Sequence, residues 1–224
     1  MFPESLEILK TVLPRVTFTV VDVGVAEGTP ELYAAFPPHE HRYLLIEASP
    51  LYSSRVEELG RELGATVEKV FCGDHNGQES FIPRTASTAA KGSKYSRKRK
   101  TEPDRVSVES ATLDSLIEKH HLSPPYVVKI DVEGAEIDVL RGAEHTLRAT
   151  EAVIVETPIV LRMHGSSSFG DIVTILTEHG FALFDIAEMS YDRRNRYLNL
   201  ANGIFVRKDN PLWDAGADSK WGIL

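Results

Sequence analysis

The sequence lacks several features that would place it in a specialised class of protein. It contains one cysteine, Cys72, so it can form neither an internal disulfide nor a cysteine-rich metal cluster. No apolar run reaches the ~18 residues of a membrane span. The first ten residues, MFPESLEILK, lack the basic start and apolar core of a signal peptide. We therefore expect a cytoplasmic protein with no membrane partner.

An excess of positive charge is also missing. The formal net charge is -8, which argues against a nucleic-acid partner. The hydrophobic fraction of 42% and the charged fraction of 26% are ordinary for a globular protein, and 224 residues suffice for one sizeable α/β domain. We see no internal repeat and no linker, so we expect a single domain over residues 1–224. The sequence leaves open whether this domain forms a homo-oligomer.

Short runs of β-branched residues alternate with helical spacing along the chain, after a short leading helix at residues 3–13. The runs are too continuous for half-exposed strands and predict buried parallel strands. The predicted strands are 17–23, 42–46, 66–71, 79–82, 105–108, 126–130, 152–155, 181–186 and 198–206. The predicted helices are 31–36, 51–63, 112–120, 135–147 and 169–179. This alternation is typical of a parallel sheet covered by helices.

Residues 84–105 have the only unusual composition in the chain. They contain eight lysines or arginines and two acids, so they carry a net charge of +6 while the remainder carries -14. They show neither helical nor strand periodicity, and we predict a mobile basic loop on the surface. Two interpretations stay open: a solvated excursion, or a lid that closes over an anionic acceptor.

Acidic residues end, or directly follow, five of the predicted strands. They are Asp22, Glu47, Asp74, Asp131 and Glu156. Ligands of open α/β sheets bind beyond the carboxyl ends of the strands, so these acids are candidate site residues. Any one of them could be a solvated acid or, like Asp131 and Glu136, a helix cap. Five acids at one edge of a sheet are harder to attribute to chance.

The glycines after the first strand have the spacing Gly24-x-x-x-Gly28. A dinucleotide fingerprint has the pattern G-x-G-x-x-G, but Ala26 and Thr29 occupy its second and third glycine places. Asp22 at the strand end would repel a pyrophosphate and attract a cation. S-adenosylmethionine carries a sulfonium and an ammonium group and no phosphate, so the loop favours that cofactor.

Two further acids have positions that suit a nucleoside. Glu47 ends the second strand, 19 residues beyond Gly28, where an acid can accept both hydroxyl groups of a ribose. Asp74 could receive the adenine amino group, although Asn76-Gly77 offers the competing interpretation of an acid before a turn.

Five segments resemble FkbM-type methyltransferases, over about residues 20–206. They are DVGVAEG, LIEASP, TLDSL, VVKIDVEGAEIDVLRGAEHTL and IVET. The resemblance implies a class I methyltransferase (Rossmann-like) fold: a seven-stranded, mostly parallel sheet with helices on both faces and an antiparallel last strand. It also implies O-methylation of a sugar or another small metabolite, with S-adenosylmethionine as donor.

The same resemblance implies that residues 22–28 and Glu47 hold the cofactor, while Asp131 faces the acceptor. The cofactor segment includes Gly24, Glu27 and Gly28. Ala48, next to the ribose-binding acid, stands where the family often has proline.

A hydroxyl acceptor is a poor nucleophile until it loses its proton, so a base is expected. Asp131 is the first candidate, and His164, in a predicted loop, is the second. Lys129 lies two residues before Asp131, on the same side of the strand, where it can keep that carboxylate ionised. We predict that all three take part in catalysis.

Three alternatives complete the expectations. Asp131, Glu133 and Glu156 are hard oxygen ligands at neighbouring strand ends and could hold Mg²⁺. An NAD(P)-dependent oxidoreductase or epimerase would use a similar sheet, although the dinucleotide glycines are missing. A non-catalytic binding module on the same fold is the third alternative.

Overall fold

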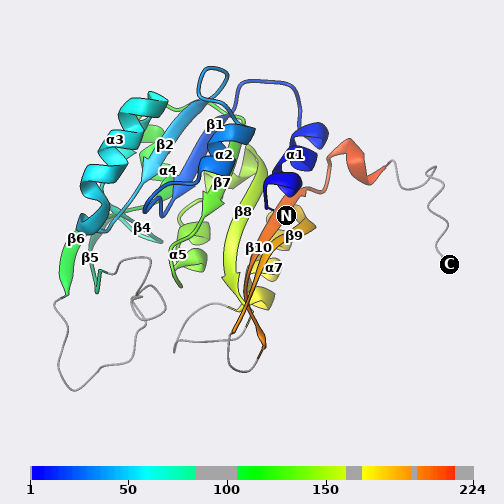
Figure 1. Ribbon diagram of the computed structural model, residues 1–224. Helices are drawn as coiled ribbons and strands as arrows, with labels where there is room; N and C mark the ends of the chain where they lie inside the picture. Colours follow the sequence, from blue (N-terminus) through cyan, green and yellow to red (C-terminus); the bar gives the residue numbers. More distant parts are fainter. Residues whose placement is uncertain (1, 84–104, 160–167, 193–195, 215–224) are drawn as a thin grey trace.

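A computed structural model describes residues 2–83, 105–159, 168–192 and 196–214 (Figure 1). The predicted loop 84–105, apart from Arg105, and the predicted base His164 lie outside these residues. No helix in the described ranges is long and apolar enough to cross a membrane.

The centre of the molecule is a seven-stranded sheet in the order β3-β2-β1-β7-β8-β10-β9. Its strands are β1 (Thr19–Val23), β2 (Arg42–Ile46), β3 (Thr66–Glu68), β7 (Tyr126–Ile130), β8 (Thr150–Pro158), β9 (Phe181–Tyr191) and β10 (Leu198–Arg207). β10 pairs antiparallel with both β8 and β9, and the other pairs are parallel. The predicted fold class is therefore confirmed, including the antiparallel last strand.

Helices cover both faces of this sheet, and each face has its own apolar cluster. One face, called the α2 face, carries α1 (Phe2–Val12), α2 (Pro30–Ala35) and α3 (Ser53–Leu63), the last preceded by the 3-10 turn η1 (Pro50–Tyr52). The other face, called the α5 face, carries α4 (Leu113–Lys119), α5 (Glu136–Arg141), α6 (Glu144–Arg148) and α7 (Phe169–Glu178). A second 3-10 turn, η3 (Pro211–Trp213), follows β10.

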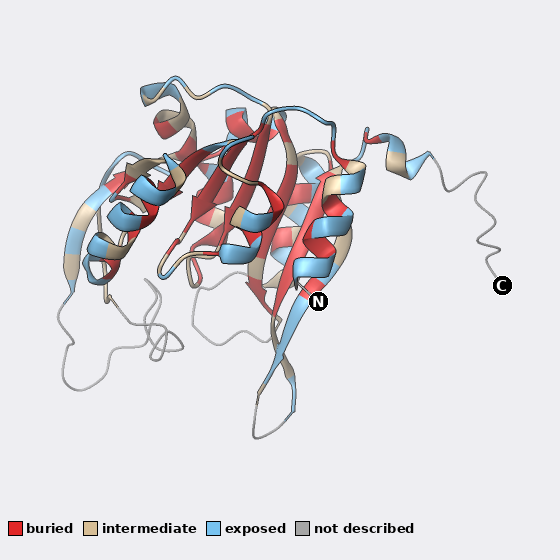
Figure 2. Cartoon of the chain, turned by 45° about the horizontal axis from the view of Figure 1, so that its top comes forward, coloured by how far each residue is buried: buried red, intermediate tan, exposed pale blue. Residues whose placement is uncertain are grey.

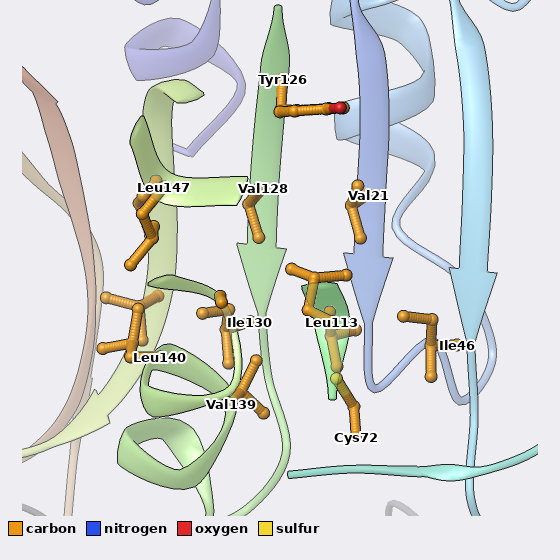
Figure 3. Packing of buried hydrophobic residues seen from close by; sticks show 14 of the residues in the cluster. Val21, Ile46, Cys72, Leu113, Tyr126, Val128, Ile130, Val139, Leu140 and Leu147 are labelled. Atoms are coloured by element: carbon orange, nitrogen blue, oxygen red, sulfur yellow. The ribbon is translucent and has the colours of Figure 1, made fainter. Parts of the chain in front are cut away.

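The burial of the central strands explains their sequences. All five residues of β1 and of β7 are buried, because both sides of each strand are covered (Figure 2). Successive side chains point to opposite faces, so Val20 joins the cluster on the α2 face while Val21 joins the one on the α5 face. Figure 3 shows Val21, Val128 and Ile130 among the α5-face side chains.

The predicted third strand, residues 66–71, is wrong in its second half. β3 ends at Glu68, and the chain then forms β4 (Phe71–Cys72) in a separate small sheet of order β4-β6-β5. The other two strands of that sheet are β5 (Gly77–Phe81) and β6 (Val106–Ala111). The chain leaves the main sheet because Val70 and Cys72 turn into the apolar cluster on the α5 face.

The predicted helix at residues 135–147 is two helices, α5 and α6, separated near Gly142. A Cβ at position 142 would lie 2.0 Å from the carbonyl oxygen of Gly73. Only glycine, which has no side chain, therefore fits at this position. Asp114 then binds the start of α6, accepting hydrogen bonds from the backbone N–H of His145 at 2.9 Å and of Thr146 at 2.7 Å. Contacts with a distant segment, rather than local spacing, therefore set the break.

Candidate functional site

The parallel strands β1, β2, β7 and β8 end at one edge of the sheet, and the glycine loop lies there. Gly24 has φ +83°, and a Cβ at this position would lie 1.9 Å from the carbonyl oxygen of Asp131. The N–H of Asp131 in turn donates to the carbonyl of Val23 at 2.9 Å. The loop after β1 and the end of β7 are thus held in direct backbone contact.

Asp22 lies beneath this loop and is fully buried. Its carboxylate accepts hydrogen bonds from Thr29 Oγ1 at 3.2 Å, from Tyr33 Oη at 2.7 Å and from Lys129 Nζ at 3.2 Å. Three elements therefore meet on one carboxylate: the glycine loop, α2 and β7. In this structure Asp22 supports the loop from inside, whereas the sequence suggested an acid directly facing a cation.

Lys129 is the positive centre of the edge. Its Nζ lies 3.2 Å from Asp22 Oδ1 and 3.4 Å from Asp131 Oδ2, and the side chain is 6% exposed. Burial alone would lower the pKa of Lys129, but the attraction of Asp22 and Asp131 outweighs it and raises the pKa above the usual value. Lys129 is therefore charged, and it forms an ion pair with both carboxylates.

Asp131 is the partner that reaches solvent. Its side chain is 33% exposed, while that of Asp22 is fully buried. Lys129 approaches one of the two Asp131 oxygens, Oδ2. This places a solvent-accessible carboxyl group at the rim, where a general base would have to act.

Glu47 joins the glycine loop to the end of β2. Its Oε2 accepts the N–H of Ala26 at 2.8 Å, and its Oε1 accepts the N–H of Ser49 at 2.6 Å. Burial raises the pKa of Glu47, and these two hydrogen bonds partly offset that effect. Each carboxylate oxygen can accept a second hydrogen bond, so the group can still take two hydroxyl groups.

The other predicted cofactor residues divide into two groups. Gly24, Gly28 and Ala48 are half-buried around Glu47 and the loop, while Glu27 is exposed. Asp74 follows β4 of the small sheet, is exposed and lies 2.8 Å from His75 Nδ1. Its predicted place at the end of a main-sheet strand is therefore wrong, because the chain has already left that sheet. Its predicted contact with adenine stays a prediction.

A second polar group lies on the same face, next to Asp131. Ile154 and Ile204 belong to the α2-face cluster. Glu156 lies two residues after Ile154 and Asn202 two residues before Ile204, so both point to that face as well. Glu156 and Asn202 are paired in register between β8 and β10. The amide of Asn202 donates from Nδ2 to Glu188 Oε2 at 3.2 Å. Sequence reasoning missed Asn202, although a polar residue inside the apolar strand 198–206 was a usable signal.

Burial dominates the charge state of two acids here. Burial, followed by the charges of Asp131, Glu133 and Glu136, raises the pKa of Glu156 to about 9. Burial also raises the pKa of Glu136 to about 7, although its Oε1 accepts the N–H of Gly134 at 2.7 Å. Glu136 is 2% exposed, so it is more than the simple helix cap that the sequence allowed.

The predicted magnesium site is not supported. In the described ranges no group of three or more His, Cys, Asp or Glu side chains could hold a metal ion, and Asp131, Glu133 and Glu156 form no such group. The physical reason is that Lys129 already neutralises Asp131, while burial favours the protonated form of Glu156.

Comparisons with known proteins identify a family and a fold. A family model described as the methyltransferase FkbM domain matches residues 22–183. The hexuronic acid methyltransferase AglP of Haloferax volcanii is 30% identical over 159 residues, which cover 70% of this chain and 60% of the relative. The match thus spans less than two thirds of that relative's length.

One solved structure shows the same fold with little sequence similarity. It is a putative sarcosine dimethylglycine methyltransferase from Galdieria sulphuraria, with a TM-score of 0.50 and 12% identity, covering 93% of this chain and 85% of that chain. At this identity the likeness shows the fold and not the substrate.

Proposed function

Because this chain belongs to the FkbM methyltransferase family, we propose that it transfers a methyl group from S-adenosylmethionine to a hydroxyl group of a sugar or another small metabolite. The family match covers most of the chain and favours a methyltransferase over the oxidoreductase and the non-catalytic binding module. The proposal concerns the donor, the acceptor and the residues that serve each.

The glycine loop and Glu47 fit the nucleoside end of S-adenosylmethionine. The loop backbone comes close to β7 without side chains in the way, and Glu47 is held by Ala26 and Ser49 with one acceptor site left on each oxygen. Asp22, Lys129 and Asp131 together carry one net negative charge, which complements a sulfonium rather than a pyrophosphate. The residues present therefore suit this cofactor, which supplies the methyl group as a good electrophile.

The observation that carries the proposal is the Lys129–Asp131 pair beside the glycine loop. Asp131 is the exposed carboxylate of that pair, and its backbone contacts the loop at Gly24 and Val23. In the proposed mechanism Asp131 takes the proton of the acceptor hydroxyl. Such a base is worth ~10²–10⁴-fold, and alignment of donor and acceptor supplies a further ~7–11 kcal/mol.

The acceptor class is supported by the relative from Haloferax volcanii, whose name gives hexuronic acid as its substrate. A sugar acceptor carries several hydroxyl groups, and an acid-lined rim can bind them through hydrogen bonds. Whether the acceptor of this chain is anionic, as the basic residues 84–105 would suit, is decided by assay.

Two measurements test the proposal. Calorimetry should detect binding of S-adenosylhomocysteine and no binding of NAD. Transfer of a labelled methyl group should then be observed to hydroxylated acceptors, in a panel of neutral glycosides, uronic acids and non-sugar polyols. Binding of NAD in preference to S-adenosylhomocysteine, or transfer to nitrogen acceptors alone, would contradict it.

A further inference from the structure

The edge of the sheet beyond Asp131 continues as a polar row. Ile130 pairs with Val155 in register, so Asp131 and Glu156 follow at the same level, and Glu156 pairs with Asn202. The row thus runs from the base, across β8, to β10. Only its first member has a role in the proposed function.

Glu156 is half-buried and faces this row without a partner of its own. In the part of the chain that the structure describes, its carboxyl group makes no hydrogen bond and no ion pair, although Glu47, Asp22 and Asp131 all do. A half-buried carboxyl group with no partner among the described residues keeps hydrogen-bonding capacity that a ligand can use.

Asn202 is held in a fixed orientation beside it. The register between β9 and β10 shifts between Ala201 and Asn202, which leaves Glu188 as an extra residue of β9 with φ +45°. This bulge directs the Glu188 carboxylate to the Asn202 amide at 3.2 Å. Bulges often redirect side chains next to active sites.

A second unsatisfied group lies close by. Glu136 Oε2 is buried and has no hydrogen-bond partner in the described ranges, and the charge of Glu136 acts on Glu156. A buried carboxyl oxygen without a partner has capacity for a further hydrogen bond.

We propose that Glu156 is a specificity-determining residue which, with Asn202, hydrogen-bonds neighbouring hydroxyl groups of a neutral sugar acceptor. The proposal rests on the proposed methyltransferase function and names the acceptor groups at its site. A carboxyl and a carboxamide side by side can each donate to and accept from hydroxyl groups, which suits a pair of them.

The charges around Glu156 favour a neutral group over a carboxylate. Asp131, Glu133 and Glu188 are acids near this row, and the buried cation Lys129 is already shared by two carboxylates. A uronate placed here would meet like charges, which weakens its binding. The hydroxyl of a neutral sugar avoids that cost.

The test measures methyl transfer with matched variants and acceptors. The acceptors are methyl glycosides of neutral hexoses and of the corresponding hexuronic acids, with S-adenosylmethionine saturating. Glu156→Ala should raise the KM for the best neutral glycoside by roughly tenfold or more and change kcat by less than about threefold. Glu156→Gln, which keeps the shape and both hydrogen-bonding roles, should restore most of the wild-type KM.

Glu151→Gln is the matched control, because Glu151 lies on the same strand at its opposite end and should leave the KM unchanged. S-adenosylhomocysteine affinity should be the same in every variant. If Glu156→Ala fails to fold, Asn202→Ser supports the same comparison.

The outcomes separate the two proposals. If transfer persists and Glu156→Ala keeps the wild-type KM, or if the wild type prefers the uronic acid to its neutral counterpart, the role of Glu156 is wrong while the methyltransferase assignment stands. If the enzyme saturated with S-adenosylmethionine methylates no glycoside of the panel, and the enzyme loaded with S-adenosylhomocysteine binds none, both the sugar acceptor and the role of Glu156 are overturned.

Discussion

The carboxyl side chains at the edge of the sheet differ in burial and in ion pairing, and these differences set their roles. Asp22, Asp131 and Glu136 are three carboxyl groups within one region, yet one is sealed in an ion pair, one reaches solvent and one is buried without a cation. Their environments, and not their chemistry, assign their roles.

The first residue-scale prediction concerns the base. Asp131→Asn keeps the shape of the side chain and removes its capacity to take a proton, so turnover should fall by ~10²–10⁴-fold. Calorimetric affinity for S-adenosylhomocysteine should stay within a few-fold of wild type, because Asp22 still neutralises Lys129.

If Asp131→Asn lost affinity for S-adenosylhomocysteine by as large a factor as it lost turnover, Asp131 would serve cofactor binding and not proton transfer. His164 is the alternative base from the sequence. If Asp131→Asn remains active while His164→Ala is inactive, the base is His164.

The second residue-scale prediction concerns pH. Burial raises the pKa of Glu136 to about 7 in the folded state, above its ordinary value of 4.5. The folded state therefore binds this proton more tightly than the unfolded state, and stability is lost as pH rises from about 4.5 through 7. Glu136→Gln removes that loss and keeps an oxygen for the N–H of Gly134.

Urea unfolding of both proteins between pH 5 and pH 8 measures the effect. Between pH 5 and pH 8 the wild type should lose roughly 2–3 kcal/mol more unfolding free energy than Glu136→Gln loses. Parallel pH dependences of the two proteins would contradict the assigned pKa.

At the scale of elements, the break between α5 and α6 shows how one helix depends on another part of the chain. Residues 135–147 have continuous helical spacing, but the backbone of Gly73 occupies the space that a side chain at 142 would need. Asp114 on α4 then provides the hydrogen bonds that begin α6. The TLD motif seen in the sequence thus joins α4 to α6.

Gly142→Ala should therefore destabilise the protein by about 1–3 kcal/mol, because its Cβ would overlap the carbonyl of Gly73 and the backbone must move. Gly170→Ala is the matched control. Its Cβ would meet nothing closer than 3.6 Å and lies in α7, where alanine is the better helix former.

The midpoint of urea unfolding should fall for Gly142→Ala and stay level or rise for Gly170→Ala. Equal midpoints in the two variants would mean that the two helices separate for another reason.

At the scale of the whole molecule, the proposed cofactor site joins segments that are distant in the sequence. The glycine loop follows β1, Glu47 ends β2, and Asp131 ends β7, and all three strands lie side by side in the sheet (Figure 1). A ligand that contacts all three should stabilise the folded state, because it cannot find this arrangement in the unfolded chain.

S-adenosylhomocysteine at one hundred times its dissociation constant should add about 2.7 kcal/mol of stability. For a chain of this length that is a rise of roughly 5–10 °C in Tm. NAD at the same concentration should leave the Tm unchanged. An equal shift with both ligands would indicate a site that does not distinguish a sulfonium nucleoside from a dinucleotide.

The sequence by itself determined the order of strands and helices and the fold class. Burial on both sides of a strand leaves a continuous apolar run, and burial on one side of a helix leaves a period of 3.6, so local patterns record both. It also determined that Asp22, Glu47 and Asp131 come at strand ends. An acid at the end of an apolar run can be recognised without knowing how the strands pair.

Only the tertiary structure decided which of these acids form ion pairs and which remain accessible to a ligand. The Asp22–Lys129 ion pair joins residues 107 positions apart, and the Glu156–Asn202 pair depends on the register of an antiparallel strand. The break at Gly142 and the departure of Asp74 from the main sheet likewise depend on distant backbone. Local sequence records how deeply a residue is buried, but the identity of its neighbour is set by register and packing between segments that are far apart in the chain.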